Sequence, residues 1–276
     1  PDRDALADTL RRRLPARLAH RLIRARNIAL TQGFYHLARR RPEPVKRLLR
    51  RVAVRRIGDE AYVDEHLTPR YEPWDQRLCV VPRGDLFTAV TSGRASMVTD
   101  HIDRFVPGGV RLRSGRVLDA DIVVSATGLS LLPVGGVRMT VDGQPVDAGK
   151  RTAYRGLMLS GVPNLAYCVG YTNASWTLRA DLSHRYVLRL LSYLDRHGFT
   201  TATPDAAPSG GRRPLLDLTS GYVERARDKF PQQGDRKPWT VRQNYILDLL
   251  TLPRADVRQD MTFTRVVAPL PAEVAS

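Results

Sequence analysis

The spacing of hydrophobic residues differs between the first part of the chain and the rest. Over residues 4–58, leucines recur at three- and four-residue steps while arginines fill most of the remaining positions. This spacing predicts amphipathic helices. Pro15 interrupts the first helical run, and Pro42 and Pro44 break the second. From residue 78 onward short apolar runs replace the helical spacing, and they predict strands.

The middle of the chain is predicted to hold a hairpin and two buried strands. Residues 110–113 alternate between apolar and polar, Ser114-Gly115 supplies a turn, and 117–118 resumes the strand. The run at 121–125 is rich in β-branched residues, which is typical of a strand buried on both faces. Residues 165–169 are predicted to form another buried strand. Two shorter apolar runs lie at 78–81 and 97–99.

Helices return in the last hundred residues. A long apolar stripe predicts a helix from about Ser175 to His197, and Gly198 suits the position that follows a helix. A loop rich in proline, serine and glycine lies at 204–211, and shorter helices are predicted at 222–230 and 243–250. Strands mixed with helices favour an α/β class.

The basic charge is concentrated at one end. The net charge is +16, and residues 1–58 hold 17 Lys and Arg against 4 Asp and Glu, a balance of +13. A basic amphipathic helix can lie on an anionic membrane or grip nucleic acid. The alternative, which we favour, is a solvated helical subdomain whose arginine stems cover apolar surface. No aromatic residue interleaves the arginines between Arg3 and Arg26 to form a stacking platform.

Composition excludes several classes. A chain of 276 residues with 42% hydrophobic and 26% charged residues is globular, with one large or two modest domains. No apolar run approaches the roughly 18–20 residues that span a bilayer. Cys79 and Cys168 lie far apart and the histidines are scattered, so no metal site is predicted and a reduced, cytoplasmic protein is expected. An opening Pro1 in place of Met suggests that upstream sequence is missing.

Common catalytic motifs are missing, and three local clusters remain. The sequence has no GxSxG, HExxH, Walker A or GxGxxG motif. The first cluster, residues 66–79, holds two prolines that restrict a loop, with Arg77 where the loop enters a strand. A fixed guanidinium could hold a phosphate or a developing oxyanion there, or could simply pair with a carboxylate such as Asp75.

The other two clusters follow predicted strands. Ala126-Thr127-Gly128 ends the strand at 121–125, and its small residues would let a ligand or a second backbone approach. Residues 170–177 connect a predicted buried strand to the long helix, and Asn173 or Ser175 is a credible N-cap. Free N–H groups of that first helical turn would favour partial negative charge, although plain capping explains the pattern equally well.

Taken in order, these clusters resemble one family. The segments HLTPRYEPWDQRLCVVPRGDLF, DADIVVSATG and GVPNLAYCVGYTNASWTLRADL resemble the carboxyl-terminal half of flavin-dependent Baeyer–Villiger monooxygenases, most of all the ethionamide-activating branch. The match runs from Asp64 to Gly198, with a weaker echo in 221–222 and 238–245. The resemblance implies an α/β flavoprotein with two Rossmann-like dinucleotide-binding domains, one for FAD and one for NADPH, whose amino-terminal half is missing here.

The resemblance also implies a division of the chain. Residues 1–120 would be the remainder of the NADPH-binding domain with a helical insertion. Residues 121–204 would be the carboxyl-terminal part of the FAD-binding domain, and 205–276 a terminal extension or lid. Both glycine-rich pyrophosphate-binding turns of the family, and its FxGxxxHxxxW fingerprint, are missing from this sequence.

Site residues are implied at matching positions only. Arg77 matches the catalytic arginine that faces the flavin, stabilises its peroxide anion and contacts the nicotinamide cofactor. Gln76 stands where many relatives have a lysine for the NADPH 2′-phosphate, which puts that contact in doubt. The remaining matches are Thr127 and Gly128 at the domain crossing, Asn173, Ala174, Ser175 and Trp176 at the flavin pyrimidine edge, and Trp239 and Tyr245 in a lid.

The implied reaction uses FAD, NADPH and O2. It would insert one oxygen atom into a ketone, or oxidise a thioether or amine, through a C4a-peroxyflavin. Two alternatives stay open at this point. The chain could be a truncated, non-catalytic fragment, because it lacks both pyrophosphate-binding loops. It could instead be a basic module that uses residues 3–56; nucleic acid is not favoured as its partner, whereas peripheral contact with a membrane is left open.

Overall fold

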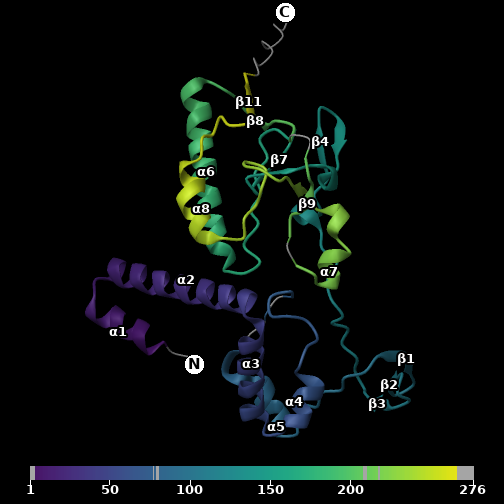
Figure 1. The fold of residues 1–276 in the computed structure, drawn as a ribbon. Helices are drawn as coiled ribbons and strands as arrows, with labels where there is room; N and C mark the ends of the chain where they lie inside the picture. The colour runs from purple at the N-terminus through teal and green to yellow at the C-terminus, as the bar shows by residue number, and fades with distance from the viewer. Residues whose placement is uncertain (1–3, 77, 79–80, 208–209, 217, 266–276) are drawn as a thin grey trace, which may run out of the picture. The chain divides into compact units, whose positions relative to one another are not determined.

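The computed structural model describes residues 4–76, 78, 81–207, 210–216 and 218–265. It divides into two compact units, Pro1–Gly128 and Leu129–Ser276 (Figure 1). The predicted domain limits at 120 and 204 refer to cofactor domains, and they stay a prediction beside this division.

The first unit begins with helices, as predicted. Asp4 caps α1 by accepting a hydrogen bond from the Ala7 N–H, and Pro15 directly precedes α2. Pro42 opens α3, where a missing N–H costs nothing because first-turn N–H groups have no partner within the helix. The helices of this unit are α1 Ala5–Arg13, α2 Ala16–Arg40, α3 Pro42–Ile57, α4 Glu60–His66 and, after the short turn η1 Pro82–Gly84, α5 Asp85–Thr91.

The apolar stripe of these helices stays largely exposed. Leu18, Leu22 and Leu30 on α2 are all exposed, whereas small side chains such as Ala7 and Ala19 are buried. Alanine lets neighbouring helices approach closely, and α1 contacts α2, which contacts α3 in turn. The helical spacing therefore predicted the helices correctly, but it did not identify the buried face.

A three-stranded antiparallel sheet completes the first unit. It consists of β1 Ile102–Val106, β2 Gly109–Leu112 and β3 Val117–Asp119 in the order β1-β2-β3. Val110 lies opposite Leu118, which confirms the predicted hairpin; β1 was not predicted. Gly109 is required because a Cβ there would lie 2.0 Å from the Leu118 carbonyl oxygen. Residues 97–99 are irregular, and of the run 78–81 residues 79 and 80 lie outside the described residues.

The two predicted buried strands are not strands in this structure. Residues 121–125 form no ladder, and Ile122 and Val124 are 83% and 82% exposed. Residues 165–169 are also irregular, although exposed and half-buried positions alternate along them. A strand buried on both faces needs a strand on each side. Among the described residues neither segment belongs to a ladder, although the Tyr167 N–H donates to the Leu157 carbonyl oxygen at 2.8 Å.

The second unit mixes helices with short antiparallel ribbons. Its ribbons pair β4 with β5, β6 with β7, β8 with β11 and β9 with β10. Among the described residues, parallel pairing is limited to two isolated bridges, so the α/β class is confirmed only as a mixture of helices and strands. The elements are η2 Pro133–Gly136, β4 Met139–Val141, β5 Gln144–Val146, η3 Ala148–Lys150, β6 Ala153–Tyr154, β7 Met158–Leu159, α6 Trp176–His197, β8 Thr201–Pro204, β9 Arg213–Pro214, α7 Gly221–Glu224, η4 Arg227–Lys229, β10 Gln232–Gln233, α8 Tyr245–Thr251, η5 Leu252–Arg254 and β11 Met261–Thr264.

Helix α6 is the main helix of this unit. It spans nearly the predicted range and ends at Gly198, whose φ of 65° is left-handed. Leu182 and Tyr186 on its inner face are almost fully buried, and the Tyr186 hydroxyl lies 3.3 Å from that of Tyr154 on β6. Helix α8 confirms the prediction at 243–250, whereas the predicted helix at 222–230 divides into α7 and η4.

Candidate functional site

The amino end of α6 is the best-defined part of the predicted site. Gly170 lies against the indole of Trp176, so that a Cβ at Gly170 would lie 2.2 Å from Trp176 Cγ. Ser175 holds the N-cap position, but its hydroxyl lies 2.9 Å from the Thr177 hydroxyl and makes no capping hydrogen bond. The first N–H groups of α6 therefore have neither a partner within the helix nor a side-chain cap.

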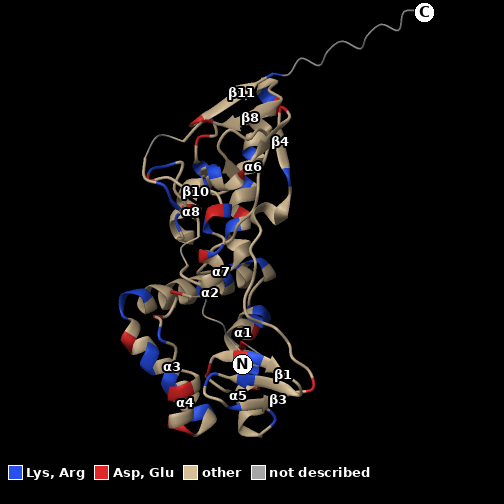
Figure 2. Ribbon diagram, turned by 90° about the vertical axis from the view of Figure 1, so that its right-hand side faces the viewer, with Lys and Arg blue, Asp and Glu red and all other residues tan. Residues whose placement is uncertain are grey.

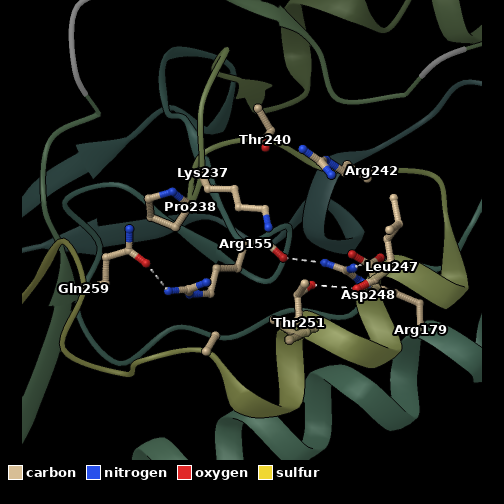
Figure 3. A pocket seen from close by; sticks show the side chains of 12 residues that line it. Arg155, Arg179, Lys237, Pro238, Thr240, Arg242, Leu247, Asp248, Thr251 and Gln259 are labelled. Atoms are coloured by element: carbon tan, nitrogen blue, oxygen red, sulfur yellow. Dashed lines mark hydrogen bonds and ion pairs between the residues drawn. The ribbon is translucent and has the colours of Figure 1, made fainter.

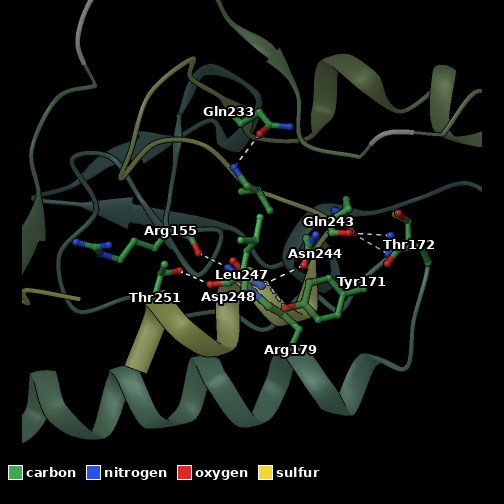
Figure 4. A network of polar contacts seen from close by, with 12 residues as sticks. Arg155, Tyr171, Thr172, Arg179, Gln233, Gln243, Asn244, Leu247, Asp248 and Thr251 are labelled. Atoms are coloured by element: carbon green, nitrogen blue, oxygen red, sulfur yellow. Dashed lines mark hydrogen bonds and ion pairs between the residues drawn. The ribbon is translucent and has the colours of Figure 1, made fainter. Parts of the chain in front are cut away.

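Asn173 anchors the loop that leads into α6. Its side chain is buried, and its Nδ2 donates to the Gln243 carbonyl oxygen at 2.8 Å. The Thr172 N–H donates to Gln243 Oε1 at 3.0 Å (Figure 4). Asn173 Oδ1 is buried without a hydrogen-bond partner in the described structure. Of the four residues predicted here, Ser175 and Trp176 are exposed, Ala174 is half-buried and Asn173 faces inward.

A buried ionic network lies next to this loop. Asp248 on α8 accepts hydrogen bonds from the Tyr171 hydroxyl, at 2.7 Å, and from Arg179 Nη1 on α6 (Figure 4). Arg179 Nη2 also donates to the Arg155 carbonyl oxygen. The side chains of Arg179 and Asp248 are only 5% and 12% exposed. The network therefore links α6, α8 and the start of the predicted flavin-facing loop.

The sequence analysis did not identify this network, although the position of Arg179 in the sequence indicates a buried charge. Arg179 lies between Leu178 and Leu182 on the apolar stripe of α6, where a charged residue requires a buried partner. Nothing in the sequence identifies Asp248 as that partner, 69 residues further on. Burial, reinforced by the Asp248 carboxylate, raises the pKa of the Tyr171 phenol, so that this hydroxyl stays a protonated donor at neutral pH.

Both residues predicted for a lid are packed inside the second unit. Trp239 is 1% exposed, and its Nε1 donates to Asp260 Oδ2 at 3.0 Å. Tyr245 is buried with its ring edge-on to that of Tyr171, 6.3 Å between centroids. In this structure the two side chains are core residues, and their membership of a lid stays a prediction.

The remaining predicted residues belong to the first unit. Arg77 lies outside the described residues, and Gln76 is the last described residue before it. Thr127 and Gly128 are exposed at the end of the first unit, where Gly128 has a φ of 124°. The structure thus brings Asn173–Trp176 together at the amino end of α6 in the second unit, whereas Gln76, Thr127 and Gly128 lie in the first unit. In the described part of the chain, no three His, Cys, Asp or Glu side chains form a group that could hold a metal.

Figure 2 marks where basic and acidic residues lie along the helices of the first unit. Several basic residues of this segment pair with carboxylates. Arg50 on α3 lies 2.6 Å from Asp64 and 3.1 Å from Glu60, both on α4. Arg26, Arg39 and Lys46 also pair with carboxylates. These contacts agree with the favoured interpretation of a helical subdomain. Within the described residues, no helix has both the length and the apolar character to cross a membrane.

Comparison with known proteins identifies the family of this chain. The chain is 44% identical to the FAD-containing monooxygenase EthA of Mycobacterium tuberculosis, over 98% of the chain and 56% of that relative. It is 44% identical to the probable FAD-binding monooxygenase AlmA of Acinetobacter baylyi, over 92% of the chain and 51% of AlmA.

A further relative is the putative FAD-containing monooxygenase MymA of M. tuberculosis, 43% identical over 90% of the chain and 50% of MymA. The chain belongs by sequence to the family of these FAD-containing monooxygenases, and it spans about half the length of these relatives. This confirms the resemblance found in the sequence. No family model matches the chain, and no solved structure matches it.

Proposed function

We propose that this chain is part of an FAD- and NADPH-dependent monooxygenase that transfers one oxygen atom from O2 to a small molecule. The substrate would be a ketone, in a Baeyer–Villiger reaction, or a thioether or amine. The observation that carries the proposal is the identity of 44% over 98% of the chain to a protein named as an FAD-containing monooxygenase. The activity belongs to the whole protein, of which the chain spans about half by comparison with its relatives.

The amino end of α6 fits the edge of a flavin. When bound, FAD would accept a hydride from NADPH and activate O2. The uncapped N–H groups at Trp176 and Thr177 would donate to the pyrimidine oxygen and nitrogen of the isoalloxazine, where negative charge gathers on reduction. Gly170 supports this arrangement because it leaves room for the indole that covers the loop. Asn173 would act as an anchor of the loop and not as a direct ligand.

Two segments with the sequence pattern of buried strands fit a longer flavoprotein. Residues 121–125 are rich in β-branched residues, exposed and unpaired among the described residues. Residues 165–169 alternate between exposed and half-buried positions. We propose that both join a parallel sheet whose other strands come from the rest of the protein. On this proposal residues 1–120 finish an NADPH domain, 121–204 return to the FAD domain, and 205–276 extend it.

Arg77 is the proposed catalytic residue. Its guanidinium would stabilise negative charge that develops on the activated oxygen, in a site from which the protein excludes water. Gln76, Thr127 and Gly128 would contribute to the cofactor sites, with Gln76 lacking the charge that many relatives offer to the 2′-phosphate. These roles come from the resemblance, because Arg77 lies outside the described residues.

The test is Arg77→Ala in the full-length protein. We expect the variant to bind flavin and to consume NADPH, but to release hydrogen peroxide in place of oxygenated product. Arg70→Ala, an exposed arginine of the same loop, is the matched control and should retain product formation. Normal product yield in the Arg77 variant would contradict the assignment. Failure of the unaltered full-length protein to bind flavin would contradict the proposed function as a whole.

A further inference from the structure

A small basic pocket lies in the second unit, beside α8. It has a volume of about 210 Å³, which is below the roughly 300 Å³ where sites for drug-sized ligands begin. Its wall is formed by the loop at Lys237–Arg242, by Arg155 after β6 and by the face of α8 that carries Asp248 (Figure 3). A pocket of this size suits a small ligand or one charged group of a larger ligand.

The charges that line this pocket do not cancel. Arg155, Arg179, Lys237 and Arg242 all line it, and Asp248 is the only carboxylate among the lining residues. Asp248 is engaged by Arg179. The Arg155 guanidinium donates to three neutral acceptors: the Tyr154 hydroxyl at 3.2 Å, the Asp256 carbonyl oxygen at 3.1 Å and Gln259 Oε1 at 2.9 Å. Three positive charges therefore remain without a paired carboxylate in the lining.

Two of these cations are free to bind a ligand. The Lys237 ammonium and the Arg242 guanidinium are exposed, and neither has a hydrogen-bond or ion-pair partner among the described residues. Figure 3 shows both side chains reaching over the pocket from the same loop. Holding several like charges together in a concave site is unfavourable unless an anion binds there.

The loop that carries them is well anchored. The Trp239 N–H donates to the Arg236 carbonyl oxygen at 2.9 Å, and the Trp239 carbonyl oxygen accepts from the Gly234 N–H at 2.8 Å. The buried Trp239 indole fixes the centre of the loop, and the Val241 N–H donates to Gln233 Oε1 at 2.8 Å. Because the backbone is held at several points, the Cα positions from which the two cationic side chains extend are fixed before any ligand arrives.

We propose that this pocket binds the phosphate dianion of a small organic phosphate monoester. An excess of three positive charges suits a dianion better than a carboxylate, and arginine matches phosphate oxygens with two parallel hydrogen bonds. Pro238, Leu252 and Ala255 supply an apolar wall for the organic part. Such a site is additional to the FAD and NADPH sites of the proposed function.

Protection of Lys237 from acetylation tests the proposal in the 276-residue chain. The chain has four lysines, so mass spectrometry resolves each acetylation rate separately. Phenyl phosphate is the probe, at pH 7.5 where its second ionisation, with a pKa near 6, is nearly complete. We expect saturating probe to slow Lys237 acetylation about fivefold, while exposed Lys229, which does not line the pocket, serves as the internal control.

Two arginine variants distinguish binding at this pocket from a general effect of the net charge of the protein. Arg242→Gln should raise the half-protecting concentration of phenyl phosphate about tenfold, as expected for one lost charge-assisted contact. Arg185→Gln removes the same charge from the exposed side of α6 and should change nothing. Weaker protection by inorganic phosphate would support an organic phosphate as the ligand, and equal protection would support phosphate itself.

Three results would overturn the proposal. One is equal slowing at Lys237 and Lys229, and another is an equal effect of the Arg242 and Arg185 variants. The third is stronger protection by FAD or NADPH than by phenyl phosphate, which would assign the pocket to a cofactor. None of these results bears on the Arg77 test, so failure of this proposal and failure of the proposed function are distinguishable.

Discussion

Neutralising Asp248 should destabilise the second unit strongly. Asp248→Asn keeps the size of the side chain but removes the charge that faces Arg179, whose side chain is only 5% exposed. Breaking a buried ion pair from one side costs about 3–5 kcal/mol because the remaining charge is left uncompensated. The Asn oxygen can still accept from the Tyr171 hydroxyl, and the Arg155 carbonyl oxygen still accepts from Arg179. We therefore expect a loss of about 3 kcal/mol, at the lower end of that range.

Urea unfolding followed by tryptophan fluorescence measures this loss. Trp239 is buried in the second unit and reports on it when the other two tryptophans, Trp74 and Trp176, are replaced by phenylalanine in every variant. Asp256→Asn is the control, since its partner Arg258 is exposed and such surface pairs contribute less than about 1 kcal/mol.

A double substitution separates charge burial from simple loss of packing. Asp248→Leu combined with Arg179→Met removes both charges, and apolar replacements of this kind are often neutral for stability. We expect the double variant to be more stable than Asp248→Asn alone. The reasoning is refuted if Asp248→Asn loses less than about 1 kcal/mol, or if the double variant is as unstable as the sum of its two single changes.

Two further predictions concern the loop before α6 and the charge pairs of the first unit. Gly170→Ala should lower the free energy of unfolding in urea by about 1–3 kcal/mol, because its Cβ would overlap the Trp176 indole. Gly211→Ala is the control and should be nearly neutral, since no atom lies within 4 Å of its new Cβ. Equal stability of the two variants would contradict the packing argument. Hydrogen bonding to Arg50 lowers the pKa of Asp64 in the folded protein. The ionised carboxylate therefore stabilises the fold above the unfolded-state pKa of about 3.9. This contribution is lost as the pH falls through the lower pKa of the folded state. Asp64→Asn should therefore flatten the acid limb of a thermal melting series, and an unchanged limb would contradict the assignment.

The local pattern of the sequence was sufficient for elements that complete their own hydrogen bonds. Helix α6 and the β2–β3 hairpin are stabilised by contacts within a short stretch of chain, so leucine spacing and the Ser114-Gly115 turn predicted them correctly. The strand predicted at 121–125 failed because a strand depends on partners that its own residues do not specify. Composition of a segment indicates that it can pair, not whether a partner is present.

The candidate site follows the same division. Gly198 at the carboxyl end of α6 was identified from cap chemistry, which is local. Of the two residues predicted as N-cap, Asn173 and Ser175, Ser175 holds the position but makes no capping hydrogen bond. The Arg179–Asp248 pair and the anchoring of Asn173 by Gln243 join residues about 70 positions apart, and no spacing rule connects them. The basic pocket was missed for the same reason, since Arg155 reaches it from a different part of the chain than Lys237 and Arg242.

The two hydrogen bonds to Gln243 also have a consequence for insertions and deletions among members of the family. They close a stretch of about 70 residues between the loop before α6 and the segment before α8. The entropy lost on closing a flexible loop grows only with the logarithm of its length, by about 0.6 kcal/mol for each doubling. Insertions or deletions in the proline- and glycine-rich region 204–211 would therefore add little to that cost. Members of the family could lengthen or shorten this segment while the start of α6 keeps its position.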